Sequence, residues 1–350
     1  MNIIAKITGI KYKPLLCREL KKYSLSELET ALSKDATFIL EVDNRNQLAV
    51  SYWVSAKRTR SYPYARVYDS LGFTGKKVTI IPIVKDEGFR GDRDFLQWDT
   101  ISLMSLLGVY VIIAYYTDAE KNTRFEDKIT SQQYDIEYVK NEIHSLLVYQ
   151  SDALHWNIMQ TRKIKEIAGK ALDAYEKISK KLTVRVHSRP LAEKRIEEIV
   201  KSKNAFMDFS RALAKSAQKR ESGTTHKNEK ILSGKKSTLT ITNYLGGNYY
   251  FTADEARLKQ NKILLIEAKN TKNSKLPAIS DIKDGLLHMI LFTNLEQVKI
   301  NQKKYLPKAV LKLTTAKKFK IKNYTKLLDL LKKEAKTNKF LIELNNKFIN

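Results

Sequence analysis

Two acidic residues and a lysine in the last third of the chain have the side-chain types that metal-assisted hydrolysis requires. Asp254 is followed, after twelve intervening residues, by the tripeptide Glu267-Ala268-Lys269. Carboxylate oxygens are the ligands that hard divalent cations prefer, and an ammonium group can position a water molecule or stabilise charge that develops on a phosphate. A metal ion and such a cation are what phosphodiester hydrolysis needs.

The spacing predicts that the three side chains converge on one face of a strand pair. If Gln260 and Asn261 form a two-residue turn, Asp254 lies directly across from Glu267. Facing residues of antiparallel strands have Cβ atoms about 4.5 to 5.5 Å apart, so the two carboxylates would repel unless a cation lay between them. Lys269, two residues after Glu267, shares its face of the strand.

Two alternatives stay open from these residues alone. A three-residue loop would place Glu255, in place of Asp254, opposite Glu267 and would make Glu255 the metal ligand. In the second alternative, Glu267-Ala268-Lys269 is only the solvated end of a core strand, as a bare acid-x-lysine triplet often is.

The elements predicted around these residues are three strands, a helix and a fourth strand. The apolar run Ile263–Ile266 indicates a buried strand that ends at the charged residues. The predicted order is strand 238–244, strand 249–258, strand 263–269, a helix from an N-cap at 280 to about 295, and strand 309–314. A closing amphipathic helix has leucines at 327, 328, 330 and 331 on one face and lysines on the other.

In this setting, Asp254 and Glu267-Ala268-Lys269 resemble the PD-(D/E)xK nuclease core of many type II restriction endonucleases. The resemblance covers 238–315 and departs from the family at Ala253, where proline is frequent. It implies that Asp254 and Glu267 are ligands of Mg²⁺ and that Lys269 is the catalytic lysine. It further implies sequence-specific hydrolysis of double-stranded DNA by a restriction enzyme of a restriction-modification system.

The fold class predicted for the whole chain is α/β, with a mixed sheet of restriction-endonuclease-like type flanked by helices. Residues 1–120 are predicted to be an N-terminal α/β lobe that is a candidate for DNA recognition. Residues 121–220 are predicted to be a helical region and 221–350 the catalytic core with its basic C-terminal helix. Within the first two regions we expect strands 37–42, 47–55, 65–68, 77–84 and 109–116, and helices 95–107, 125–181 and 190–219.

A rival candidate site lies in the N-terminal lobe. Its acidic and basic residues surround a second strand-helix-strand run and are Asp69, Lys85, Asp86, Asp92, Asp94 and Asp99. Ile83 stands where the second acid of the triad would be, so this set is incomplete. The simpler interpretation is a structural lobe with a solvated acidic loop.

The charge of the chain indicates a polyanionic partner. The formal net charge is +26, and residues 301–350 contain 14 Lys or Arg against 3 Asp or Glu. Such a field attracts phosphate backbones, although a ribosome or a membrane surface would fit the same sign. Candidate DNA contacts are Lys57, Arg58, Arg60 and Arg66 in an aromatic and basic stretch, and Lys227 in the loop 222–228. The alternative interpretation of this loop is a solvated linker.

Other sequence features bound the function. The single cysteine, Cys17, and the absence of a secretion signal or long apolar run predict a cytoplasmic protein with no membrane span. The five histidines have no metal-ligand spacing and are expected to be structural. A homodimer is expected because a duplex offers two strands to cut. The alternatives to a restriction enzyme are a structure-specific repair nuclease and a non-catalytic nucleic-acid-binding protein.

Overall fold

The computed structural model describes residues 1–349 except 57–60, 202–234, 244–247 and 317–318, and its elements form two compact units. Unit 1 comprises Met1–Arg18, Tyr64–Gly72 and Arg211–Asn350, and unit 2 comprises Glu19–Pro63 and Phe73–Ser210. These units differ from the predicted divisions at 120 and 220, because the N-terminal residues pair with the last third of the chain. None of the described helices is long and apolar enough to cross a membrane.

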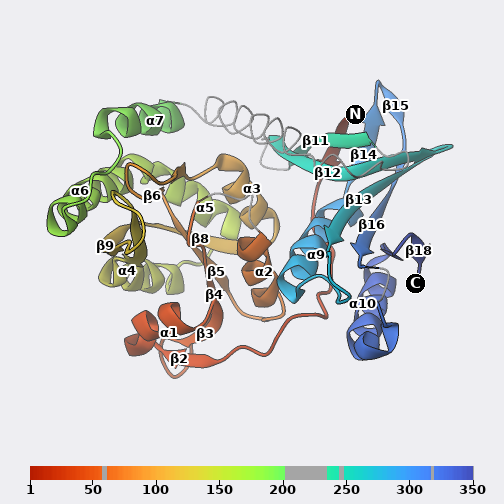
Figure 1. Ribbon diagram of the computed structural model, residues 1–350, viewed down its shortest axis with the longest axis horizontal. Coiled ribbons are helices and arrows are strands. Elements are labelled where there is room, and N and C mark those ends of the chain that lie inside the picture. The colour runs from red at the N-terminus through yellow and green to blue at the C-terminus, as the bar shows by residue number, and fades with distance from the viewer. Residues whose placement is uncertain (57–60, 202–234, 244–247, 317–318, 350) are drawn as a thin grey trace. The chain divides into compact units, whose positions relative to one another are not determined.

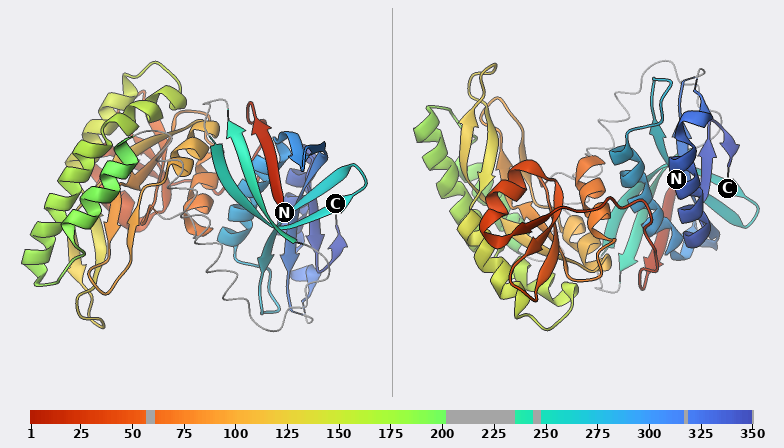
Figure 2. Two further views of the ribbon diagram at one scale, coloured as in Figure 1. Left: turned by 90° about the horizontal axis from the view of Figure 1, so that it is seen from above. Right: turned by 90° about the horizontal axis from the view of Figure 1, so that it is seen from below.

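The core of unit 1 is a mixed sheet in which neighbouring strands come from both ends of the chain (Figures 1 and 2). The strand order is β15-β14-β1-β11-β12-β13-β16-β17-β18. The bounds are β1 Asn2–Ile7, β11 Lys235–Asn243, β12 Asn248–Lys259, β13 Lys262–Asn270, β14 Glu296–Ile300, β15 Lys303–Lys304, β16 Leu306–Thr314, β17 Leu341–Leu344 and β18 Lys347–Phe348.

Strands β11, β12 and β13 are antiparallel to one another, whereas β16 is parallel to β13 and β17 is parallel to β16. The connections that make parallel pairing possible are α9 (Ile279–Thr293) and α10 (Thr325–Asn338), the latter preceded by a short 3-10 helix, Ile321–Tyr324. The three predicted strands, the helix and the strand at 309–314 are all present, but the unpredicted strands β14 and β15 lie between α9 and β16 in the chain.

Helix α9 covers the face of the sheet to which the charged residues belong. It packs against β13 and β16, and its residues from Ile282 to Phe292 are buried. The run Ile263–Ile266 on β13 is buried on both faces of the sheet. Burial of each such aliphatic side chain contributes about 1.5–3 kcal/mol, so β13 is held rigidly at the centre of unit 1.

Five strands of unit 1 were not predicted: β1, β14, β15, β17 and β18. Strand β1 lies between β11, to which it is parallel, and β14. Its burial alternates, with Ile3, Ala5 and Ile7 inside and Ile4 52% exposed. The apolar Ile4 on the outer face obscured the alternation in the sequence.

Unit 2 is built on a second sheet with the strand order β2-β3-β4-β5-β8. Its strands are β2 Lys22–Ser24, β3 Thr37–Glu41, β4 Gln47–Tyr52, β5 Lys77–Pro82 and β8 Val109–Ala114, with the pairs β6 Val84–Asp86 and β7 Arg93–Phe95, and β9 Tyr116–Lys121 and β10 Ile129–Tyr134. Its helices are the 3-10 turn Leu25–Glu27, α1 Leu28–Lys34, α3 Trp98–Leu106, α4 Ile136–Leu147, α5 Ala153–Arg162, α6 Ile164–Leu182 and α7 Arg189–Lys201. The mixed α/β class predicted for the chain is confirmed.

Two predictions of local structure are wrong. The predicted strand 65–68 belongs to helix α2 (Ser61–Ser70), because Pro63 suits the first turn of a helix and Tyr64, Val67 and Tyr68 recur on one buried helical face. The predicted helical stretch 125–181 begins with strand β10, which pairs with β9. The helix predicted to reach 219 is described only to Lys201.

A buried carboxylate forms hydrogen bonds with separate chain segments of unit 1. Glu334 of α10 is fully buried and accepts hydrogen bonds from the hydroxyls of Tyr12 and Tyr68 and from the backbone N–H groups of Leu15 and Leu16. Four donors to one carboxylate compensate for much of the cost of its burial. This network joins the N-terminal segment and α2 to α10.

Candidate metal centre

The strand pair that carries the predicted acids has the register expected from a two-residue turn. The ladder of β12 and β13 pairs Glu255 with Ile266 and Lys259 with Lys262, and the turn residue Gln260 has φ 52°. Continued by one step, this register sets Asp254 level with Glu267. The Oδ2 atom of Asp254 accepts a hydrogen bond of 2.8 Å from the backbone N–H of Ala268, which fixes the exposed carboxylate of Asp254 against β13.

Glu255 belongs to the opposite face of the sheet, so the alternative with a three-residue loop is wrong. Arg257 Nη2 donates to Glu255 Oε2 at 2.9 Å, and Arg257 also pairs with Glu343 at 3.1 Å. Lys312 Nζ lies 3.5 Å from Glu343 and 3.8 Å from Glu255. This opposite-face cluster contains two carboxylates and two cations, and its charges balance.

On the face of Glu267, Lys269 bridges two buried carboxylates. Lys269 Nζ donates to Glu267 Oε1 at 2.8 Å and also to Oδ2 of Asp284, which comes from α9. Glu267 and Asp284 are each only 5% exposed. Glu267-Ala268-Lys269 is therefore not a solvated strand end, as the simpler interpretation had it.

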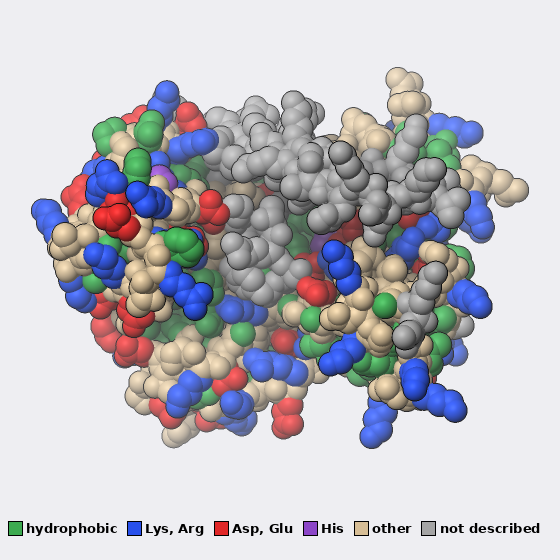
Figure 3. All heavy atoms as spheres, viewed as in Figure 1, with side chains coloured by type: hydrophobic (Ala, Val, Ile, Leu, Met, Phe, Trp, Pro, Cys, Tyr) green, Lys and Arg blue, Asp and Glu red, His purple; other side chains and the backbone are tan. Residues whose placement is uncertain are grey.

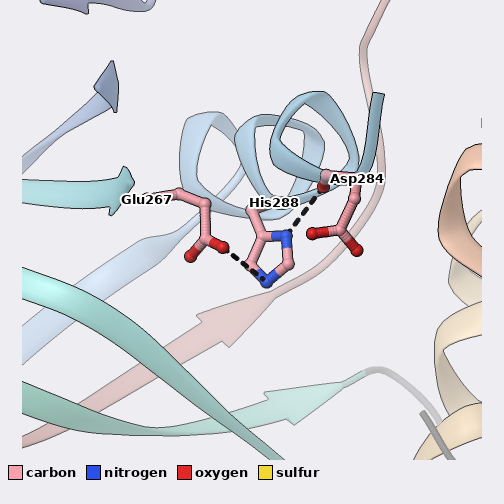
Figure 4. A group of neighbouring side chains, drawn as sticks. All are labelled: Glu267, Asp284 and His288. Atoms are coloured by element: carbon pink, nitrogen blue, oxygen red, sulfur yellow. Dashed lines mark hydrogen bonds and ion pairs between the residues drawn. The ribbon is translucent and has the colours of Figure 1, made fainter. Parts of the chain in front are cut away.

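Helix α9 adds a histidine that sequence reasoning took to be structural. His288 follows Asp284 by one helical turn, and its Nδ1 is 2.8 Å from the backbone oxygen of Asp284 (Figure 4). Its Nε2 points at Glu267 and lies 3.6 Å from Oε1 (Figure 4). One ligand atom each from Glu267, Asp284 and His288 lies within 4.8 Å of the others, and all three residues are buried. We call these three residues the acid-histidine cluster.

Burial and neighbouring charges shift the pKa values of residues in and next to the cluster. Burial lowers the pKa of His288 to about 4, so the ring is neutral at pH 7. Burial also raises the pKa of Asp284 above its ordinary value. Burial alone would lower the pKa of Lys269, but the negative charges of Glu267 and Asp284 outweigh it and raise that pKa. Lys269 is thus charged at every physiological pH.

Aromatic rings hold the imidazole of His288 in place. The Phe251 ring lies 4.4 Å from it between centroids, and the rings of Tyr64 and Phe292 are 6.0 and 6.2 Å away. A ring that is packed in this way loses little further freedom when its nitrogen binds a ligand.

Of the predicted residues, Glu267 and Lys269 are in direct contact, whereas Asp254 contacts β13 at the backbone N–H of Ala268 and is not part of the acid-histidine cluster. Asp284 and His288 were missed, and the only signal for them was the i, i+4 spacing on the predicted helix after the strand. Among the described residues, the acid-histidine cluster is the group with metal-ligand geometry, and no acid of the rival site belongs to it.

The rival set is divided between the two units and is engaged in other contacts. Asp69 is in unit 1, where Lys283 Nζ is 2.5 Å from its Oδ1. In unit 2, Asp86 lies 2.8 Å from Nδ1 of His187 and accepts from the backbone N–H of Gly88. Lys85 forms an ion pair of 2.7 Å with Glu87. The remaining acids are Asp92, Asp94 and Asp99, also in unit 2.

The predicted DNA contacts are largely outside the part of the chain that the structure describes. Lys57, Arg58, Arg60 and Lys227 fall in the segments 57–60 and 202–234. Arg66 is described and lies half-buried on α2. Its position does not test a role in DNA binding.

Comparison of the chain with protein family models, with curated proteins and with solved structures found no match.

Proposed function

We propose that this protein is a metal-dependent DNA endonuclease whose site is the face of β12, β13 and α9 that carries Asp254, Glu267 and Lys269. The observation that supports this most directly is the hydrogen bond from Ala268 to Asp254, which holds one acid against the strand of the other acid and the lysine. The carboxylates of Asp254, Glu267 and Asp284 outnumber the single ammonium group of Lys269. The resulting negative charge favours binding of a divalent cation.

The arrangement of elements also supports this function. Strands β11 to β13 form an antiparallel meander, α9 follows, and β16 returns parallel to β13. This is the order expected of the PD-(D/E)xK core that the sequence resembles, with the acids on the second and third strands. We therefore infer a restriction-endonuclease-like core within the larger sheet of unit 1.

The residues present fit a divalent metal ion. Glu267, Asp284 and His288 would hold it, whereas the predicted ligand Asp254 is not part of that group and accepts a hydrogen bond from the backbone N–H of Ala268. A bound divalent ion neutralises phosphate charge and lowers the pKa of its water. Lys269, whose charge is secured by its carboxylate neighbours, would stabilise negative charge that develops on the phosphate.

The charge distribution of unit 1 supports a nucleic acid as substrate. Helix α10 and the residues next to it expose Lys322, Lys326, Lys333, Lys336 and Lys339. Lys and Arg side chains stand out at the lower right of the molecule, over α10 (Figure 3). Double-stranded DNA, cut at a specific sequence, is the proposed substrate, as for the type II enzymes that the core resembles.

A cleavage assay with matched variants tests the function. Long unmethylated duplex DNA is incubated with Mg²⁺ or Mn²⁺ and with wild-type protein, Glu267→Gln, Lys269→Met or the control Lys262→Met, which alters an exposed lysine of the same strand. We expect discrete fragments from wild type and the control, and losses of about 10² or more in rate for the other two. Equal cutting by all four proteins would move the chemistry to another site.

The same purified protein can be used to test the alternative functions and the predicted homodimer. Cleavage confined to forked or damaged DNA would indicate a structure-specific repair nuclease, and metal-independent binding without cleavage a non-catalytic nucleic-acid-binding protein. A homodimer remains a prediction, which analytical ultracentrifugation with and without DNA would test.

A further inference from the structure

The hydrogen bond of His288 to the backbone of α9 directs its other ring nitrogen, Nε2, at Glu267. A backbone carbonyl can only accept a hydrogen bond, so the 2.8 Å contact with the oxygen of Asp284 places the hydrogen of the neutral ring on Nδ1. Nε2 is then an acceptor, and it points at Oε1 of Glu267 from 3.6 Å. An imidazole nitrogen and a carboxylate oxygen that face each other in a buried place can share a metal ion, which here would share Oε1 with the ammonium group of Lys269, 2.8 Å away.

The packing of the His288 ring does not use Nε2. The rings of Phe251 and Phe292 and the carbonyl of Asp284 already give the imidazole its packing and one hydrogen bond. Nε2 takes part in neither of these and is directed at a carboxylate oxygen of Glu267. The opposite-face cluster of Glu255, Arg257, Lys312 and Glu343 pairs each carboxylate with cations and includes no histidine.

The distances suit a metal ion of ordinary radius. Bonds to imidazole nitrogen and carboxylate oxygen are about 2.0–2.2 Å long, so two such ligands of one ion lie about 3.0–3.5 Å apart at tetrahedral or octahedral angles. The separation of Nε2 and Oε1 is 3.6 Å, and one ligand atom of each of the three residues lies within 4.8 Å of the others. The hydrogen bond from Nδ1 to a backbone carbonyl is also how metal-binding histidines are commonly oriented.

We propose that Glu267, Asp284 and His288 form a metal site that selects first-row transition metals, from Mn²⁺ to Zn²⁺, over Mg²⁺ and Ca²⁺. Mg²⁺ binds carboxylates and water and has little affinity for imidazole, whereas transition metals accept a nitrogen ligand readily. This inference rests on the proposed function for the identity of the site. It replaces the Mg²⁺ expected from the family resemblance with a metal that the imidazole of His288 favours.

Direct metal binding by the full-length protein tests the inference without any nuclease assay. Electron paramagnetic resonance of Mn²⁺ measures its affinity, and Mg²⁺ is titrated as a competitor. We expect wild type to bind Mn²⁺ at least tenfold more tightly than Mg²⁺. His288→Gln should lose most of that preference, and His155→Gln, which alters an exposed histidine of unit 2, should keep it.

A spectroscopic measurement on the wild type avoids dependence on a variant that could misfold. Electron spin echo envelope modulation of bound Mn²⁺ should show coupling to the nitrogen of one imidazole. Equal affinity for Mn²⁺ and Mg²⁺, or absence of the nitrogen coupling, would overturn the inference even if DNA is cut. Selective Mn²⁺ binding with nitrogen coupling but no cleavage of any DNA would uphold the metal site and reject the nuclease function.

Discussion

Gly285 of α9 lies directly against the side chain of Lys269. A Cβ atom at Gly285 would be 3.4 Å from Cε of Lys269 and 2.6 Å from Cδ1 of Leu311. Glycine normally weakens a helix interior relative to alanine, so its presence here has a packing reason. The missing side chain leaves room for the aliphatic part of Lys269 to lie against α9, where its ammonium group contacts Glu267 and Asp284.

Replacing Gly285 should therefore disturb the site. In Gly285→Ala we expect no net stabilisation, because the clash with Leu311 offsets the helix-propensity gain of about 1 kcal/mol. Displacement of Lys269 should lower the cleavage rate about tenfold or more. Urea-induced unfolding measures the effect on stability, and the cleavage assay on long duplex DNA measures the effect on rate.

Gly169→Ala is the matched control for this prediction. Gly169 lies within helix α6, and a Cβ there would meet nothing within 4 Å. This variant should be stabilised by about 0.5–1 kcal/mol with unchanged cleavage. If the two variants had the same stability and the same cleavage rate, the close contact of Gly285 with Lys269 would have no effect on either property.

The part of the site that the sequence predicts is the part determined by local geometry. The relation of Asp254 to Glu267 depends only on the turn at Gln260 and Asn261, and the two-residue turn gives the observed register. Lys269 follows from the alternation of a strand. Such features are fixed within one hairpin, and no distant contact is needed to infer them.

The residues that were missed depend on contacts between distant segments. Asp284 and His288 reach Glu267 because α9 crosses over the sheet at one particular rotation, which the helical pattern alone does not specify. Strand β1 pairs with β11, although β11 follows it by more than two hundred residues in the chain. Both facts are set by the packing of the whole unit, in which local propensity is only one contribution.

The buried Glu334 leads to a prediction about pH. Burial raises the pKa of Glu334 above 4.5 and also raises the pKa values of Tyr12 and Tyr68, which remain hydrogen-bond donors. Because the folded protein holds the proton of Glu334 more tightly than the unfolded chain, the contribution of this titration to stability is full below the unfolded pKa and is lost as pH rises through the folded pKa.

The measurement is the difference in unfolding free energy between wild type and Glu334→Gln. This difference should decrease as pH rises above the ordinary pKa of a glutamate, because the variant lacks the titrating group. Glu296→Gln, which alters an exposed acid of β14, serves as the control and should give a nearly constant difference. A difference for Glu334→Gln that grows with pH would contradict this prediction. It would mean that the hydrogen-bond donors stabilise the charged carboxylate by more than its burial destabilises it.

The exposed lysines of α10 lead to a prediction about DNA binding. Lys326, Lys333 and Lys336 lie on the exposed side of the helix, opposite the buried Leu328 and Leu331. If they contact phosphates, replacing all three by glutamine removes counterion release, and the slope of log K against log salt should fall by up to about 0.9 for each lysine lost.

Fluorescence anisotropy of a labelled duplex at several salt concentrations measures that slope. The control replaces Lys165, Lys177 and Lys180, exposed lysines of α6 in unit 2, by glutamine and therefore removes the same charge. Equal losses in the two triple variants would indicate that only net charge matters. A loss confined to the α10 variant would place the duplex on unit 1, the unit that contains the acid-histidine cluster.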